Sequence, residues 1–202
     1  MYPTIREPKQ KRAKEKKERI IEAGWELMSK NGYYSTNTAE IAKEAGVSTG
    51  IVYQYFQDKH DILMEAIDRH MDDVFFPMIN VKNIKIDFKE YDNLMRRMLN
   101  KYIKNHNLSK VAHEEIIAMV HSDEEVAKKF YEKEIETANS IKELLMFNGV
   151  EDNNLDEKVH IMMGIIDNVC HEVTYHRHKE INYDKMIDLV VDNARNLFKN
   201  DF

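Results

Sequence analysis

Apolar residues recur at spacings of three and four along nearly the whole chain, and no segment alternates between apolar and polar positions for long enough to suggest a strand. After residue 8 the chain has a single proline, Pro77, so only one position there forbids the interior of a helix. The pattern therefore predicts an all-α protein of about nine helices. They are expected over residues 9–31, 38–45, 49–56, 58–76, 87–105, 109–121, 123–147, 156–178 and 183–199.

The composition is typical of a soluble globular protein, with 43% hydrophobic and 33% charged residues in a chain of 202. A chain of this length forms one or two domains and can bury a sizeable core. It has no run of eighteen apolar residues that would span a membrane, and its N-terminal residues lack the apolar core of a secretory signal. Cys170 is the only cysteine, which rules out an intrachain disulfide and fits a reducing compartment. We therefore expect a cytoplasmic protein.

Charge is unevenly distributed along the chain. Residues 1–59 carry 11 lysines and arginines against 8 acidic residues, whereas residues 60–202 carry 19 against 28. A basic end on an acidic body fits a module that binds a polyanion, and a solvated tail is the alternative. If the tail binds DNA, its basic residues supply phosphate or minor-groove contacts: Lys9, Lys11, Arg12, Lys14 and Lys16.

Two short helical segments, residues 38–45 and 49–56, are separated by a three-residue turn that contains Gly46. This arrangement predicts a helix-turn-helix, because its turn needs a residue able to adopt a positive φ angle. Small residues leave room for the two helices to approach, namely Ala42, Ala45 and Gly50. The second helix of such a motif enters the major groove of DNA through its N-terminal end. That end has a polar outer face made of Ser48, Thr49, Tyr53 and Gln54.

Many positions around this motif follow a familiar order. They are Ile20, Ile21, Ala23, Leu27, Gly32 and Tyr33, then Thr38, Ile41, Ala42, the run 45–48, Gly50, Tyr53, Tyr55, Phe56, Lys59 and Leu63. In this order, residues 17–65 resemble the TetR family of bacterial transcriptional regulators. Beyond residue 70 only the number and size of the helices agree with that family.

The resemblance implies a three-helix DNA-binding domain with a basic tail over residues 1–59. It also implies a larger helical domain for ligand binding and dimerisation over residues 60–202. The family's DNA-contacting positions correspond here to Thr38, Ala39, Ser48, Thr49, Gly50, Tyr53, Gln54, Tyr55 and Lys59.

Side-chain chemistry divides these positions by role. Thr49 and Gln54 are the candidates for reading bases, because a glutamine amide can form two hydrogen bonds with adenine. Ala39 departs from the longer polar residue that could reach a base edge, and its methyl group can only meet a thymine methyl. Phosphate contacts, which position the protein without specifying a sequence, fit Thr38, Tyr53, Tyr55 and Lys59. For Tyr55, packing against the first helix stays open.

One helix-turn-helix reads only a few base pairs, so specific binding usually needs two of them, held about 34–36 Å apart in a dimer. The last two expected helices are apolar on several sides, and Gly164 would permit close packing between helices. As the resemblance implies, we expect these helices to form a four-helix interface with a second copy of the chain. An ordinary monomer core is the alternative.

The resemblance further implies a small-molecule site among the remaining helices. Methionine adapts to irregular apolar surfaces, and the chain contains 12 methionines, so a flexible apolar pocket is expected. The candidate lining residues are Met64, Met71, Phe75, Met95, Met98, Tyr102, Met119, Phe130, Tyr131 and Met163. Each of these residues, taken singly, also fits ordinary core packing.

No catalytic residue, metal or cofactor is expected, because the sequence has no Ser/His/Asp arrangement, phosphate-binding glycine loop or cysteine spacing for a metal. Glu157 and His160 form one Glu-x-x-His pair without a second, so the histidines fit a polar helix face. Cys170 fits a small buried apolar residue better than a redox sensor.

The sequence thus predicts a dimeric repressor that a small apolar or amphipathic ligand releases from its operator. An enzyme and a membrane protein are not expected. The alternatives are an activator, a regulator without a small-molecule inducer, and a sequence-tolerant DNA binder.

Overall fold

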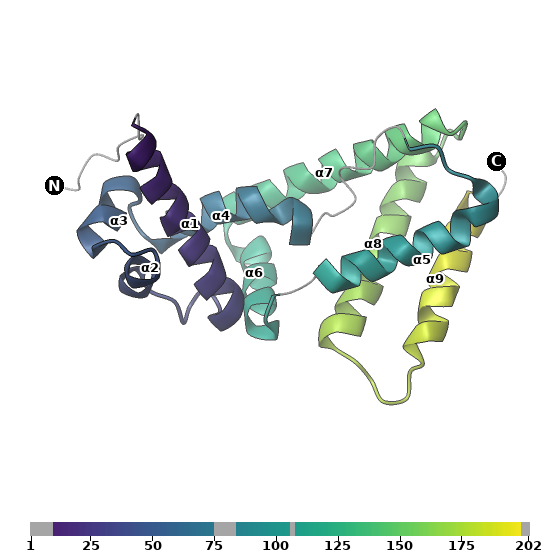
Figure 1. The fold of residues 1–202 in the computed structure, drawn as a ribbon. Helices are drawn as coiled ribbons and strands as arrows, with labels where there is room; N and C mark the ends of the chain where they lie inside the picture. Colours follow the sequence, from purple (N-terminus) through teal and green to yellow (C-terminus); the bar gives the residue numbers. More distant parts are fainter. Residues whose placement is uncertain (1–9, 75–83, 106–107, 199–202) are drawn as a thin grey trace. The chain divides into compact units, whose positions relative to one another are not determined.

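The computed structural model of the protein describes residues 10–74, 84–105 and 108–198. Within these ranges the chain forms nine α-helices, one short 3-10 helix and no strand (Figure 1). The all-α class and the number of helices predicted from the sequence are therefore confirmed. None of the helices in the described ranges is long and apolar enough to cross a membrane. The α-helices are α1 (Lys11–Asn31), α2 (Thr38–Glu44), α3 (Thr49–Tyr55), α4 (Lys59–Val74), α5 (Tyr91–Asn105), α6 (Lys110–Ser122), α7 (Glu124–Phe147), α8 (Leu155–Tyr175) and α9 (Tyr183–Leu197).

The chain divides into two compact units, and the divisions fall after Met71 within α4 and after Phe130 within α7. The first unit contains α1, α2, α3, α6 and the N-terminal parts of α4 and α7. The second unit contains α5, α8, α9 and the C-terminal part of α7, together with the 3-10 helix Phe88–Glu90. The boundary expected between residues 59 and 60 separates domains by role and stays a prediction.

In the first unit, α1 packs closely against α4. Ile20, Ile21 and Met28 form the buried stripe of α1, and Gly24 lies within the same stripe. A methyl group added to Gly24 would lie 2.5 Å from Cγ2 of Ile62 on α4, far inside normal contact distance. The absence of a side chain at Gly24 therefore allows the two helices to approach.

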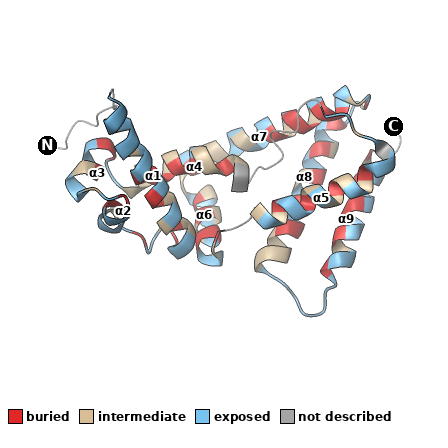
Figure 2. Cartoon of the chain, viewed as in Figure 1, coloured by how far each residue is buried: buried red, intermediate tan, exposed pale blue. Residues whose placement is uncertain are grey.

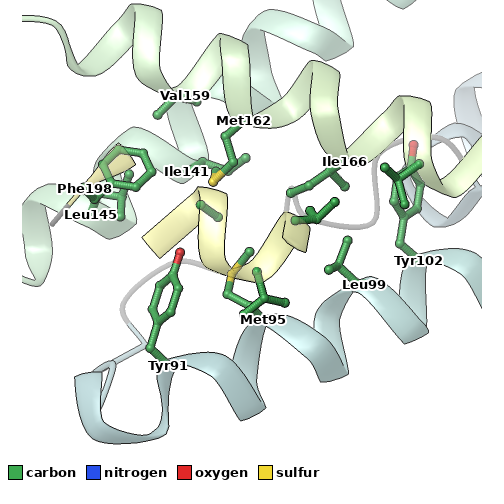
Figure 3. Close-up of a cluster of buried hydrophobic side chains, with 14 of the residues drawn as sticks. Tyr91, Met95, Leu99, Tyr102, Ile141, Leu145, Val159, Met162, Ile166 and Phe198 are labelled. Carbon is green, nitrogen blue, oxygen red and sulfur yellow. The ribbon is translucent and has the colours of Figure 1, made fainter. Parts of the chain in front are cut away.

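The core of the second unit is formed by apolar side chains from α5, α7, α8 and α9 (Figure 3). Tyr91, Met95, Leu99 and Tyr102 follow one another at spacings of three and four along α5, and all four are buried. Figure 2 shows buried positions recurring in the same way along α8 and α9. Periodic apolar positions on each helix thus produce one shared core, as expected for amphipathic helices.

The surroundings of two ionisable side chains in this core raise their pKa values. The Tyr102 hydroxyl donates a hydrogen bond to Oδ1 of Asp167 at 2.8 Å. Burial raises the pKa of Tyr102 well above its ordinary value of 10.0, and the Asp167 carboxylate raises it further. Burial, followed by the charge of Asp167, raises the pKa of Cys170 to about 12. Cys170 is fully buried and carries a neutral thiol near neutral pH.

The helix predicted over residues 156–178 ends earlier, at Tyr175. The following connection is held by the hydroxyl of Tyr183, which accepts a hydrogen bond from the backbone N–H of His178 at 2.6 Å. The same hydroxyl donates to Oε1 of Glu172 at 3.2 Å. Tyr183, the first residue of α9, therefore forms hydrogen bonds with the segment that was predicted to continue α8.

Candidate nucleic-acid interface

Helix α2 begins at a capping box formed by Asn37 and Glu40. The Asn37 side chain accepts hydrogen bonds from the backbone N–H groups of Ala39 and Glu40, at 3.1 and 3.0 Å. In return, Oε2 of Glu40 accepts from the backbone N–H of Asn37 at 3.2 Å. This reciprocal pair satisfies N–H groups that the first turn of a helix leaves without partners. It sets the start of a helix of only seven residues, which has little stability of its own.

The turn between α2 and α3 depends on Gly46, which has a φ angle of 65°. This left-handed conformation is costly for residues with a side chain and is readily adopted by glycine. The turn is closed by backbone hydrogen bonds from Gly46 N to the Lys43 carbonyl at 3.2 Å and from Val47 N to the Ala42 carbonyl at 2.9 Å. The positive φ angle predicted for the turn is confirmed.

Helix α3 has one buried face and one exposed face. Val52, Tyr55 and the adjacent Phe56 are buried, with 8% or less of each side chain exposed. Four residues on the other side are exposed: Thr49, Gly50, Tyr53 and Gln54. A methyl group added to Gly50 would have Ser48 Oγ at 3.9 Å as its nearest neighbour, so space is open above this position. The sequence left two roles open for Tyr55, and the structure places it in the core.

The exposed face of α3 is connected to the start of α2 through Tyr53. The Tyr53 hydroxyl lies 3.0 Å from Oγ1 of Thr38, so these two side chains share a hydrogen bond. Both were predicted from the sequence as phosphate contacts. The pairing holds two hydroxyl groups side by side at the surface, where each retains capacity for a further hydrogen bond.

Lys59, also predicted as a phosphate contact, is engaged within the protein. Its ammonium group donates to the carbonyls of Tyr33 at 2.7 Å and Thr36 at 2.9 Å, and it lies 4.2 Å from the centre of the Tyr33 ring. These contacts fix the turn between α1 and α2. Burial, followed by the charge of Asp58, raises the pKa of Tyr33 to about 12. Sequence reasoning missed this role because backbone carbonyls bind lysine regardless of the side chains in the turn.

The two remaining predicted contacts lie at the beginnings of α2 and α3. Ala39 is exposed in the first turn of α2. Ser48 occupies the N-cap position of α3 and is exposed, but its side chain forms no capping hydrogen bond. The Ser48 hydroxyl is therefore not committed to capping α3. Ser48 thus adds an exposed hydroxyl at the start of α3, next to the exposed polar surface formed by Thr49, Tyr53 and Gln54.

The residues predicted to line a ligand site fall in both units. In the second unit, the core contains or contacts four of them: Met95, Met98, Tyr102 and Met163. In the first unit, four others are buried or half-buried: Met64, Met71, Met119 and Phe130. Tyr131 is 64% exposed on α7, and Phe75 lies outside the described residues.

Comparison with known proteins agrees with this architecture. Residues 20–66 match the family model of bacterial regulatory proteins, tetR family. The chain is 47% identical over 62 residues to the HTH-type transcriptional regulator HbdR of Aromatoleum sp. (strain CIB), an alignment that covers 31% of this chain and 27% of that protein. It is 43% identical over 63 residues to the fatty acid metabolism regulator protein of Bacillus subtilis (strain 168), with 31% of each chain covered.

The likeness to solved structures extends over nearly the whole chain. A Saccharomonospora viridis protein solved in complex with choline superimposes with a TM-score of 0.68 at 19% identity, covering 89% of this chain and 95% of the other. In contrast, the aligned regions span only 27% and 31% of the two curated relatives. The sequence relationship with those two proteins therefore concerns less than a third of this chain, and the structural likeness concerns the fold.

The fold and this surface define a protein with a DNA-binding helix-turn-helix domain. The match over residues 20–66 identifies this domain as one of the tetR family of bacterial regulatory proteins.

Proposed function

We propose that this protein is a sequence-specific DNA-binding transcriptional regulator whose helix α3 enters the major groove. The observation that carries the proposal is the division of α3 into two faces. Val52 and Phe56 are buried, with 0% and 1% exposed, whereas Tyr53 and Gln54 are exposed beside them. An exposed polar face on the second helix of a helix-turn-helix is the surface that reads base edges.

The exposed side chains support separate roles in DNA binding. Gln54 and Thr49 read bases, because their polar groups are exposed on α3 and an amide pairs well with adenine. Tyr53 and Thr38 contact phosphates through their paired hydroxyl groups. Lys59 acts by fixing the turn between α1 and α2, since its ammonium group already binds two carbonyls of that turn.

A dimer formed through α8 and α9 supplies the second recognition helix. Large apolar side chains are exposed on both helices: Ile161 is 54% exposed and Leu189 is 69% exposed. A methyl group added to Gly164 would meet no atom within 4 Å, so this part of α8 has room for close approach by a second copy. Two-fold pairing would bury these residues and place two α3 helices on one operator.

The proposed regulation is repression that a small apolar or amphipathic ligand relieves. The core of the second unit combines adaptable methionines, among them Met95, with a hydrogen-bonded pair between Tyr102 and Asp167 that could bind a polar head group. A ligand releases DNA only if it binds more tightly to the state that does not fit the operator. An activator or a regulator without such a ligand remains the alternative.

Selection of bound duplexes from a random pool tests the DNA-binding proposal. We expect one preferred sequence, and we expect Gln54→Ala to weaken its binding by about 5- to 150-fold per subunit, from about 1–3 kcal/mol for a bidentate base contact. Gln57→Ala is the matched control, because Gln57 is also an exposed glutamine but lies beyond the end of α3. Equal affinity for selected and shuffled duplexes would refute sequence-specific binding.

Dimerisation and ligand response need separate measurements. Light scattering should give twice the chain mass for the wild type and the chain mass for Leu189→Lys. Val111→Lys, a change at another exposed residue, is the control.

Fluorescence anisotropy of the selected duplex with fatty acids and with choline tests the ligand step, since one relative is named for fatty acid metabolism and one solved relative holds choline. A reporter gene then shows whether the bound protein lowers or raises transcription.

A further inference from the structure

We infer that Asp167 and the three ring-bearing side chains beside it bind an amphipathic organic cation, so that the effector of the proposed function carries a positive charge. The site contains Asp167, His171 and Tyr175 of α8 and Tyr102 of α5. The three α8 residues follow one another at spacings of four, so they lie on one face of that helix. Figure 3 shows Tyr102 projecting from α5 toward α8. All four residues belong to the second unit.

The Asp167 carboxylate has one oxygen engaged and one oxygen available. Oδ1 accepts the hydrogen bond from the Tyr102 hydroxyl at 2.8 Å. Oδ2 lies 3.6 Å from Nδ1 of His171, which is too long for a hydrogen bond. Among the residues that the structure describes, no lysine or arginine pairs with Asp167, and 51% of its side chain is exposed. The carboxylate therefore presents a negative charge that a ligand can reach.

Aromatic rings lie beside this carboxylate. The ring centres of His171 and Tyr175 are 6.5 Å apart. Burial chiefly raises the pKa of Tyr102, and the charges of Asp167 and Tyr175 raise it further, which places Tyr175 near the Tyr102 hydroxyl. The faces of tyrosine rings attract cations that lie within about 6 Å of the ring centre. An anionic head group would instead meet the like charge of Asp167, so the site favours a cation.

The apolar part of such a ligand has methionine side chains within reach. Met163 lies four residues before Asp167 on α8, and Met98 lies four residues before Tyr102 on α5. Both methionines are partly buried against the core of the second unit. Because methionine adapts to apolar groups of different shapes, it suits an alkyl chain that extends from the charged head. The site therefore fits a ligand with one cationic end and one apolar end.

This inference rests on the proposed function for its biological role, and calorimetry with the free protein tests it without DNA. The probes share one alkyl chain length and differ in head group: octyltrimethylammonium, octanoate and octanol. Asp167→Asn removes the negative charge and keeps an oxygen that can accept from Tyr102. Asp192→Asn is the matched control, because Asp192 is an exposed aspartate on α9 of the same unit. Measurements are made at pH 8, where ordinary histidines are neutral, and circular dichroism checks that each variant is folded.

We expect octyltrimethylammonium to bind the wild type and Asp192→Asn about 10-fold more tightly than octanol does, from one partly exposed ion pair and one cation–π contact. Asp167→Asn should lose this preference and bind octanol as the wild type does. Tighter binding of octanoate than of the cation would overturn the inference in favour of an anionic head group. Equal binding of the cation and octanol, or no binding of the cation, would overturn it as well.

Anisotropy of the selected duplex separates this inference from the proposed function. Cation binding that depends on Asp167 but leaves the duplex bound would support the cation site and overturn repression relieved by a ligand. Release of the duplex by octanol or octanoate, unchanged in Asp167→Asn and without any effect of the cation, would support ligand-relieved repression and overturn the cation site. If no duplex is preferred, the proposed function fails, and calorimetry alone decides the cation site.

Discussion

The two compact units differ in the interactions that define their structure. In the first, individual positions satisfy particular backbone needs: the capping box at Asn37, the positive φ angle of Gly46 and the close approach at Gly24. In the second, periodic apolar side chains on α5, α7, α8 and α9 form a shared core. An apolar core accepts many side chains of similar volume, whereas a cap or a tight turn accepts few. The match to the family model covers residues 20–66, which lie in the first unit.

Each unit contains one natural reporter, which makes the comparison measurable. Trp25 is the only tryptophan of the chain, and it stacks on His70 in the first unit with ring centres 4.7 Å apart. Cys170 is the only cysteine, and it is buried in the second unit. Tryptophan fluorescence therefore follows the first unit, and thiol labelling follows the second.

The largest expected effect is the protection of Cys170. Its pKa is raised from 9.0 to about 12 by burial and its side chain is 0% exposed, so at pH 8 we expect a thiol reagent to react far more slowly in the folded protein than in urea. Above pH 9 the unfolded state loses this proton while the folded state keeps it, so stability should fall as the pH rises toward 12. Fast labelling without denaturant would contradict a tightly packed second unit.

The next effect in size is the loss of core volume in the second unit. Leu99 is 1% exposed, and Leu99→Ala should lower the free energy of unfolding by about 2–5 kcal/mol. Met95→Leu, a change of similar volume in the same core, should cost less than about 1.5 kcal/mol. The free energy of unfolding of both variants is measured by urea titration, with the labelling of Cys170 as the signal. Equal losses would show that this core depends on residue identity as strictly as the first unit.

A smaller loss is expected from added volume between α1 and α4. Gly24→Ala places a methyl group against Ile62 and should cost about 1–3 kcal/mol, measured by the fluorescence of Trp25 during unfolding. Gly164→Ala is the matched control, because nothing lies within 4 Å of the added methyl group. In the monomer it should stabilise α8 by up to about 1 kcal/mol. If the proposed dimer covers Gly164, the same change should weaken dimerisation.

The smallest effect is expected at the start of α2. Asn37→Ala removes the side chain that accepts two backbone hydrogen bonds and should cost about 1 kcal/mol. Ser48→Ala changes the corresponding position of α3, where no capping hydrogen bond is formed, and should cost less. Thermal unfolding of both variants compares them directly. A greater loss for Ser48→Ala would show that Ser48 has a structural role beyond capping.

Much of the fold and part of the site could be predicted from the sequence. The spacing of apolar residues identified the nine α-helices of the described residues within a few positions, because a buried stripe must recur with the helical period. The turn at Gly46 was also predictable, since a positive φ angle restricts the residue type. The predicted end of α8 was wrong. The connection after α8 is held by a hydrogen bond to the hydroxyl of Tyr183, and the pattern of neighbouring residues does not encode this contact.

The sequence by itself determined the helices, the helix-turn-helix and which residues form the polar outer face of α3. These properties depend on local conformation and on periodicity, and both can be read from neighbouring residues. Only the tertiary structure decided that Tyr55 is buried, that Lys59 binds the carbonyls of the turn between α1 and α2, and that Arg19 borders the turn before α3. Each of these properties depends on residues from different helices or turns. How close those residues lie is set by the packing of the helices.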